Sequence, residues 1–173
     1  IVGQEVYIAW QNLSTVPGAG SDVAFVRSSD NGASFSGEVV IDDPTAERSA
    51  SFTPTMDVDS AGAGAGDDRV FIAWEDRREG TQIFASVSED GGQNFSAPVR
   101  ASGDSGDPIS GVTRGPKLVY AGGDVLVVTY MNDDPGAADH VYVASSIDAG
   151  ASWSFSQQRL DTGIGNALNP VIV

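Results

Sequence analysis

Hydrophobic and polar residues alternate along most of this chain, and this pattern predicts short β-strands. The most apolar segments each end in an aromatic residue, and each is followed along the chain by a second alternating segment. β-Branched and aromatic residues are enriched in both kinds, as is typical of strands with buried side chains. The first kind covers residues 6–10 (VYIAW), 70–74 (VFIAW) and 125–130 (VLVVTY); the second covers 22–27 (DVAFVR), 82–87 (QIFASV) and 140–145 (HVYVAS).

Two further kinds of segment complete a repeating unit of four strands. One carries a proline, which cannot donate to a ladder and is tolerated at a strand start or edge. We name the proline strand a, the aromatic strand b, the next alternating strand c and the last, more polar strand d. The chain then reads b-c-d, a-b-c-d, a-b-c-d, a. Strand a is predicted at 52–58 (FTPTMDV), 114–120 (RGPKLVY) and 168–173 (LNPVIV), and strand d at 37–41, 97–101 and 155–160.

A short motif recurs between strands c and d: Ser, any residue, Asp, any residue, Gly, two residues, then an aromatic. Its aspartates lie 60 and 58 positions apart, so the three copies are in phase with the strand repeat. Ser and Asp side chains accept hydrogen bonds from amides of their own turn, and Gly permits positive φ. The copies are Ser28, Asp30, Gly32 and Phe35; Ser88, Asp90, Gly92 and Phe95; and Ser146, Asp148, Gly150 and Trp153.

These turns, together with Trp74-Glu75-Asp76-Arg77, resemble the Asp-box, or BNR-repeat, propellers, a family that includes bacterial sialidases and many secreted proteins that act on or bind glycans. The resemblance implies an all-β propeller of four-stranded antiparallel blades, with three blades in this chain. Residues 1–173 then form one propeller domain or half-propeller, with blades at approximately 1–50 plus 166–173, 51–110 and 111–165. In that family the Asp box is structural and remote from the ligand face, so no chemistry is assigned to Asp30, Asp90 or Asp148.

Three blades cannot close a ring, because propellers have about four to eight. The first blade lacks strand a, and a spare strand a remains at 168–173. An open arc would expose apolar faces and an unpaired strand edge. Two solutions are open at this point: a second copy that exchanges strand 168–173 head to tail, giving six blades, or further blades of a longer polypeptide.

The resemblance places ligands on the face formed by the b-to-c and d-to-a loops. Arg114-Gly115-Pro116 matches the family's Arg-x-Pro signature, which makes Arg114 the main candidate for contacting an anion. The other candidates for ligand contact are Arg77, Arg78, Trp74 and Tyr130. Each also has a structural interpretation, in which the arginines shape loops and begin strands while the aromatic residues pack.

A sialidase needs an arginine cluster, a tyrosine nucleophile paired with a glutamate, and an aspartate acid/base. No complete catalytic set can be assembled here, so no catalytic residue is assigned. We therefore predict a secreted, noncatalytic module that binds a glycan or a protein, or that mediates assembly. The alternatives are a sialidase-like exo-glycosidase, or a fragment of one, and a structural repeat of a cell-surface layer or filament.

The chain has 9 basic and 24 acidic residues, a formal charge of −15, and no cysteine. Repulsion from phosphates makes nucleic acid an unsuitable partner, and the absence of a long apolar run argues against membrane insertion. An acidic surface stays hydrated where salt screens repulsion, so we predict an extracellular or cell-surface location in a marine or saline environment.

No cofactor is predicted. The single histidine, His140, has no second histidine beside it, which argues against a histidine metal site. Acidic loops at Asp42-Asp43, Asp104/Asp107 and Asp133-Asp134 could hold a structural calcium ion. Residues 59–68 (DSAGAGAGDD) do not have the spacing of a helix-loop-helix calcium site and are predicted to form an a-to-b turn.

Overall fold

The computed structural model describes residues 4–13, 20–42, 50–60, 67–78, 80–103, 112–133, 138–154 and 158–173. These residues form strands and no helix. The strands are β1 (Val6–Leu13), β2 (Ser21–Ser28), β3 (Val39–Val40), β4 (Ser51–Asp59), β5 (Arg69–Asp76), β6 (Gln82–Ser88), β7 (Val99–Arg100), β8 (Val112–Gly122), β9 (Val125–Asp133), β10 (His140–Ser146) and β11 (Gln158–Arg159).

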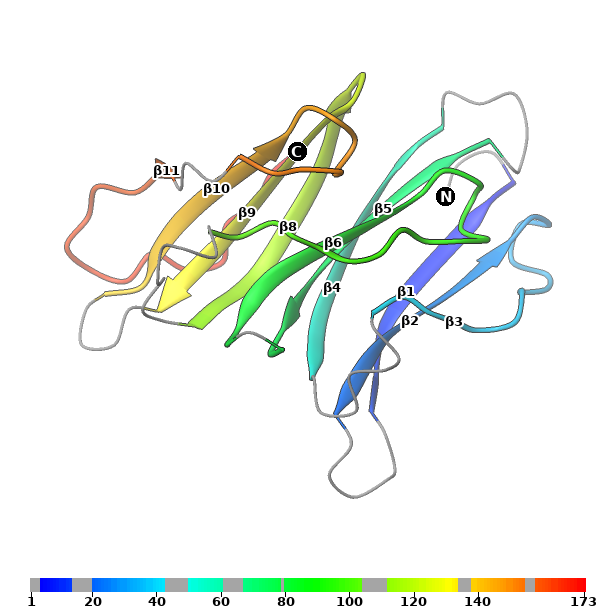
Figure 1. Ribbon diagram of the computed structural model, residues 1–173, viewed down its shortest axis with the longest axis horizontal. Helices are drawn as coiled ribbons and strands as arrows, with labels where there is room; N and C mark the ends of the chain where they lie inside the picture. Colours follow the sequence, from blue (N-terminus) through cyan, green and yellow to red (C-terminus); the bar gives the residue numbers. More distant parts are fainter. Residues whose placement is uncertain are drawn as a thin grey trace.

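The strands form three antiparallel sheets that follow one another along the chain. The first has the order β1-β2-β3, the second β4-β5-β6-β7 and the third β8-β9-β10-β11. The sheets lie side by side in sequence order (Figure 1), and β1 contacts β4 as β4 contacts β8. The predicted all-β architecture of four-stranded antiparallel blades is confirmed. We call the sheets blade 1, blade 2 and blade 3.

The prediction for the last strand needs correction. Residues 168–173 adopt no regular strand, and segment 166–173 does not join the first sheet of its own chain. It lies instead beside blade 3, where the backbone N–H of Ala167 donates to the carbonyl of Asp139 (2.8 Å). A strand needs a ladder partner, and the segment has none in the part of the chain that the structure describes.

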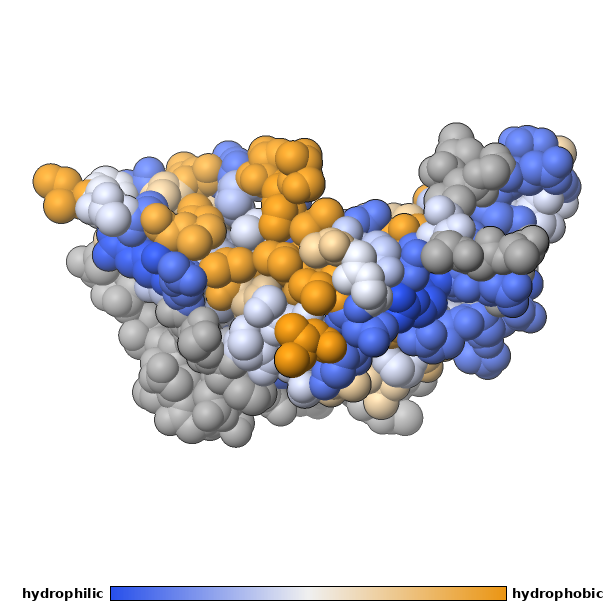
Figure 2. Space-filling model, turned by 90° about the horizontal axis from the view of Figure 1, so that it is seen from above, coloured by the Kyte–Doolittle hydropathy of each residue, from blue (hydrophilic) through white to orange (hydrophobic). Residues whose placement is uncertain are grey.

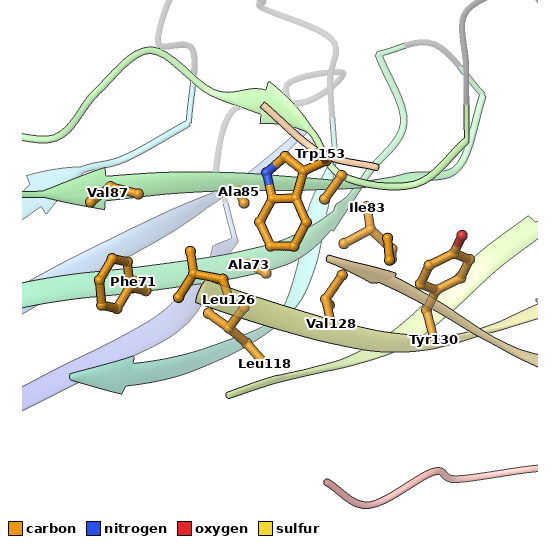
Figure 3. Packing of buried hydrophobic residues seen from close by; sticks show 12 residues of the cluster. Phe71, Ala73, Ile83, Ala85, Val87, Leu118, Leu126, Val128, Tyr130 and Trp153 are labelled. Carbon is orange, nitrogen blue, oxygen red and sulfur yellow. The ribbon is translucent and has the colours of Figure 1, made fainter. Parts of the chain in front are cut away.

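The hydrophobic core consists of two layers between neighbouring blades. Because side chains alternate along a strand, β5 sends one set of residues toward blade 1 and the other set toward blade 3. Val70, Ile72 and Trp74 pack with Tyr7, Val23 and Phe25 of blade 1. Phe71, Ala73, Ile83 and Ala85 pack with blade 3, where Trp153, Leu126 and Tyr130 cover them (Figure 3). Each blade is therefore held by its neighbours.

The three Ser-x-Asp-x-Gly turns share one set of hydrogen bonds. In each, the serine hydroxyl donates to the aspartate and accepts from the backbone N–H of the glycine, as Ser88 does with Asp90 (2.8 Å) and Gly92 (2.8 Å). The sequence did not reveal a further member, four positions after the aspartate, whose backbone N–H and side chain both donate to that aspartate. It is Ser34, Asn94 and Ser152 in the three copies.

Candidate ligand face

The ends of strands β5 and β9 and the starts of strands β4 and β8 lie on the lower side of the molecule in Figure 1, opposite the β8–β9 turn. At this end of each strand a, the residue before the proline has positive φ: 47° for Thr53, 63° for Gly115 and 54° for Asn169. The sheet register shifts at this point, between Phe52 and Thr55 and between Arg114 and Lys117. The bulge therefore sets the direction of the side chain that precedes it, which is Arg114 in blade 3. Changing the direction of a side chain is a common role of bulges.

Glycine at position 115 follows from this geometry. A Cβ there would lie 2.9 Å from the Cε of Met131, and a positive φ is readily accessible only to glycine and a few polar residues. The Gly115 backbone N–H donates to Glu75 Oε1 (2.7 Å), which also accepts from the Thr53 hydroxyl (2.7 Å). Glu75 thus connects the bulges of blades 2 and 3.

Arg114, the predicted anion contact, is held by two carboxylates. Its Nη2 lies 2.6 Å from Asp133 Oδ2 and 3.8 Å from Asp139 Oδ1, and its side chain is 41% exposed. A ligand anion would therefore compete with two existing partners. The group as a whole offers both donors and acceptors, which suits hydroxyl groups better than an isolated anion.

Arg77 and Phe52 form a second feature of this face. The exposed Arg77 guanidinium lies 4.6 Å from the centre of the Phe52 ring, a cation–π contact. Phe52 occupies the same position in strand a as Arg114, two residues before the proline. The loop face thus carries an arginine–aromatic stack from blade 2 and an arginine–carboxylate group from blade 3.

The other two blade 2 candidates are held within the fold. Trp74 is fully buried, and its indole N–H donates to Asp76 Oδ2 (3.2 Å). Arg78 pairs with the same carboxylate (2.6 Å) and lies over the ring of Phe84. In this structure Trp74 is a core residue, and Arg78 balances the charge of a buried aspartate.

A second buried carboxylate, Asp42, adjoins this group through Ser51. The Ser51 hydroxyl donates to Asp42 and lies 3.3 Å from Asp76. Burial raises the pKa of Asp42, and the hydrogen bonds from Ser51 and from the Val23 N–H offset this only in part. Perturbed carboxyl groups often mark functional sites, but Asp42 is 1% exposed, so this group lies within the junction of blades 1 and 2.

Tyr130, the candidate at the end of strand b in blade 3, is also fully buried. Its ring stacks on Tyr142, and its hydroxyl has no hydrogen-bond partner among the described residues. Burial raises its pKa well above the ordinary value. The side chain therefore forms part of the core between blades 2 and 3 (Figure 3).

The position after strand d carries a repeated polar side chain that the sequence analysis missed. Asp42, Ser102 and Asp161 occupy equivalent positions, and each accepts a hydrogen bond from a strand c backbone N–H, that of Val23, Ile83 and Val141 respectively. The available signal was a short polar residue directly after each predicted strand d. It satisfies a backbone donor at the strand end.

His140 lies next to one of these residues, with its Nδ1 3.0 Å from Asp161 Oδ2. Arg159 also donates to Asp161 and is the main cause of a pKa well below the ordinary range for this carboxyl. The described part of the chain contains no group of three or more histidine, aspartate or glutamate side chains placed to hold a metal ion. Of the acidic loops named above, Asp43, Asp104, Asp107 and Asp134 lie outside the described residues.

The aspartates that precede the a-to-b turn of blade 2 form an ion pair and a hydrogen bond with other residues. Asp59 pairs with Arg69 (2.7 Å), and Asp57 accepts from the Tyr120 backbone N–H (2.7 Å). Residues 61–66 of this turn lie outside the described ranges. Within those ranges, no helix is long and apolar enough to cross a membrane.

These sheets are consecutive blades of a β-propeller. Two solved structures are similar to the chain. One is the Hadza microbial sialidase Hz136, with a TM-score of 0.59 and 18% identity over 87% of this chain. The other is a mutant α-L-arabinofuranosidase Arb93a from Fusarium graminearum bound to an iminosugar inhibitor, with a TM-score of 0.57 and 12% identity over 90% of this chain. The fold is therefore that of a sialidase-like propeller. The chain spans 34% and 44% of those two chains. No protein-family model and no curated protein matches it.

Proposed function

We propose that the chain belongs to an Asp-box propeller and binds glycans through its loop face without hydrolysing them. The observation that carries the proposal is the make-up of that face, where Arg114 lies between Asp133 and Asp139, and Arg77 lies over Phe52. Sugar hydroxyls both donate and accept hydrogen bonds, which matches an arginine flanked by carboxylates. A glycan is accordingly a better match than a simple anion.

The fold neighbours support a glycan ligand, since both are described as glycosidases. The three equivalent turns support membership of the Asp-box family. An extracellular, saline setting is part of the proposal and is supported by the charge of −15. The noncatalytic role is supported by the burial of Tyr130, the tyrosine that ends strand b, because a nucleophile must reach the substrate.

Binding to a glycan array, followed by calorimetry on the best ligand, tests the proposal. Arg114→Ala should weaken binding at least about tenfold, the loss expected for a charge-assisted hydrogen bond. Arg69→Ala is the matched control, because this arginine also pairs with aspartates but lies beside the β8–β9 turn, on the opposite side of the molecule. Equal affinity in the two variants, or no glycan bound at all, would contradict the proposal.

The second candidate is a sialidase-like hydrolase, favoured by Arg114-Gly115-Pro116 and by the likeness to a sialidase structure. It predicts turnover of a fluorogenic sialoside that Arg114→Ala abolishes and Arg69→Ala retains. The binding proposal predicts no turnover by the 173-residue chain. The two readouts separate the candidates, since a hydrolase would be seen in turnover and a binding module only in affinity.

A further inference from the structure

A hollow lies between blades 1 and 2, beside the last strand of blade 1. Its volume is about 600 Å³, within the range of about 300–1,000 Å³ that is typical of small-molecule sites. One wall is β3 with the two residues that follow it, Ile41 and Asp42, and the other is segment 93–98, which connects β6 to β7. Both walls belong to consecutive blades of this chain, so the hollow is formed without any further blade.

The aromatic residue of the second Ser-x-Asp-x-Gly turn, Phe95, lines this hollow. Phe95 is half-buried, and its ring packs edge-on against Phe25 with the ring centres 5.1 Å apart. At the junction of blades 2 and 3 the equivalent residue is the larger Trp153, which is 3% exposed and packs with Ala101. Part of the Phe95 ring is therefore left uncovered, and it faces the hollow.

The apolar part of the lining continues from Phe95 onto both walls. Val39 and Ile41 contribute to it from blade 1, and Pro98 contributes from blade 2. The C–H groups on the face of a sugar ring are apolar, so burying them against such a surface is favourable.

Two amide side chains, those of Gln93 and Asn94, form the polar part of the lining, and both residues are exposed. Gln93 Nε2 donates to the carbonyl of Asp90 (2.9 Å), and Asn94 Nδ2 donates to Asp90 Oδ2 (2.7 Å). Neither amide oxygen accepts a hydrogen bond from the residues that the structure describes. An amide side chain both donates and accepts, as a sugar hydroxyl does.

The turn does not need these two amides in order to form. The other two turns have small residues at the same positions, Ala33 and Ala151 in place of Gln93, and Ser34 and Ser152 in place of Asn94. Ser34 and Ser152 still make the backbone and side-chain hydrogen bonds to the aspartate. The geometry of the turn therefore does not explain why amides lie beside the hollow.

The charged residues of the lining do not favour a charged ligand. The Arg78 guanidinium already pairs with Asp76 (2.6 Å) and lies over the ring of Phe84. Asp42 is 1% exposed, and its carboxylate accepts from Ser51. A neutral ligand with many hydroxyl groups matches this lining better than an anion or a cation.

The surroundings of the hollow are also polar. Figure 2 looks at the molecule from the side opposite the loop face, and it shows hydrophilic residues over the half that holds blade 1 and hydrophobic ones over the half that holds blade 3. Because the hollow adjoins blade 1, its position suits a hydrated ligand better than an apolar one.

We propose that this hollow binds a neutral oligosaccharide, at a site separate from the loop face. The amides of Gln93 and Asn94 bind its hydroxyl groups, and Phe95 contacts the face of a sugar ring. A peptide strand is a poorer match, because Pro98 in one wall has no N–H to pair with a backbone and β3 in the other wall has two residues.

The test uses the 173-residue chain carrying Arg114→Ala, so that the loop face does not contribute. This chain should bind members of an array of neutral disaccharides, trisaccharides and tetrasaccharides. Ala97 is an exposed alanine of the lining, and Ala97→Trp fills the hollow and should weaken binding at least about tenfold. Ala151→Trp is the matched control, because Ala151 is an exposed alanine of the third turn that does not line the hollow, and it should retain binding.

Gln93→Ala provides a second variant that should fold normally, because the third turn has alanine at this position. Its affinity should fall about three- to tenfold, as expected for the loss of a neutral hydrogen bond. Urea midpoints measured on all variants show whether each is folded. In ¹⁵N NMR spectra, the best oligosaccharide should shift the side-chain amide signals of Gln93 and Asn94.

The outcomes distinguish this site from the loop face. Binding that survives Arg114→Ala and is lost in Ala97→Trp would support the hollow whether or not the loop face binds a glycan. Neutral oligosaccharide binding that Arg114→Ala alone abolishes would support the loop face and overturn the hollow. Equal binding by Ala97→Trp and Ala151→Trp, no neutral oligosaccharide bound, or binding to a parallel peptide array alone would each overturn the proposal.

Discussion

Glu75 and Gly115 lie forty positions apart, yet the Glu75 carboxylate accepts a hydrogen bond of 2.7 Å from the Gly115 backbone N–H in the next blade. The same oxygen accepts from the Thr53 hydroxyl. We expect Glu75→Ala to lower the free energy of unfolding by about 2 kcal/mol, because a partly buried amide and a hydroxyl lose a charged acceptor.

Urea unfolding monitored by tryptophan fluorescence would measure this loss. Glu75→Gln keeps an acceptor oxygen and should cost less. Glu38→Ala is the matched control, because among the described residues Glu38 makes one hydrogen bond, an exposed one with Asn12. Its unfolding free energy should stay within about 0.5 kcal/mol of the wild type. Equal losses in Glu75→Ala and Glu38→Ala would mean that Glu75 does not couple the blades.

Gly92 should tolerate alanine far less than Gly32 does. Both glycines end a Ser-x-Asp-x-Gly turn with nearly the same φ, +82° and +85°, so the backbone strain of substitution is shared. A Cβ at Gly92 would lie 2.4 Å from the Phe25 ring, whereas at Gly32 the nearest atom is 3.9 Å away.

Overpacking of a well-packed core costs about 1–3 kcal/mol. Gly92→Ala should therefore unfold at a lower urea concentration than Gly32→Ala by that difference in free energy. Similar midpoints for the two variants would show that Phe25 moves aside without cost, and the blade 1–blade 2 contact would then be looser than the structure shows.

Acid should destabilise the fold through its aspartate turns. Hydrogen bonds from the Ser34 and Ser28 hydroxyls lower the pKa of Asp30 to about 2. At Asp90 partial burial opposes the shift, but hydrogen bonds from Asn94 and Ser88 outweigh it and lower the pKa to about 2. A carboxyl whose folded pKa is depressed contributes stability above its unfolded pKa, and that contribution is lost as the pH falls through the folded value.

The loss should therefore fall between about pH 4 and pH 2. Urea midpoints measured from pH 7 to pH 2.5 should show the wild type losing more stability below pH 4 than Asp90→Ala does. Between pH 7 and pH 5 the difference between the urea midpoints of the two proteins should be constant, and this constant difference serves as an internal reference. Parallel curves down to pH 2.5 would contradict the role of Asp90.

Tyr130→Phe should leave stability unchanged or raise it by up to about 1 kcal/mol. The Tyr130 hydroxyl is buried and has no hydrogen-bond partner among the described residues, so its removal relieves a desolvation cost. Tyr7→Phe is the contrasting control, because the Tyr7 hydroxyl donates to Asp68 (2.6 Å) and its loss leaves a buried carboxylate with one partner fewer. A large loss from Tyr130→Phe would mean that its hydroxyl has a structural partner.

The local features of the fold were predictable from sequence. The turn at Asp90 is made by residues within six positions of one another, so the motif indicated the hydrogen bonds of Ser88 with Asp90 and Gly92, although it did not include Asn94. The strands followed the alternation of side chains, although β1, β5 and β9 run two or three residues past the aromatic that was predicted to end them. Those extra residues bury Trp74 and Tyr130 within a strand instead of leaving them at its end.

The candidate site was less predictable, because its residues are brought together from separate blades and loops. The sequence singled out Arg114 but not its partners Asp133 and Asp139, whose approach depends on how β9 and β10 are arranged. The role of Glu75 depends on the bulge at Gly115, and positive φ before proline is unusual enough that pattern alone did not indicate it.

The sequence by itself determined the repeat, the turns and the order of strands, since these depend on side-chain alternation and on hydrogen bonds between near neighbours in the chain. Only the tertiary structure decided which aromatic residues are core, which carboxylates neutralise each arginine, and where residues 168–173 lie. Those outcomes depend on the blade alongside, and a residue such as Phe35 or Trp153 is exposed or buried according to whether that blade is present.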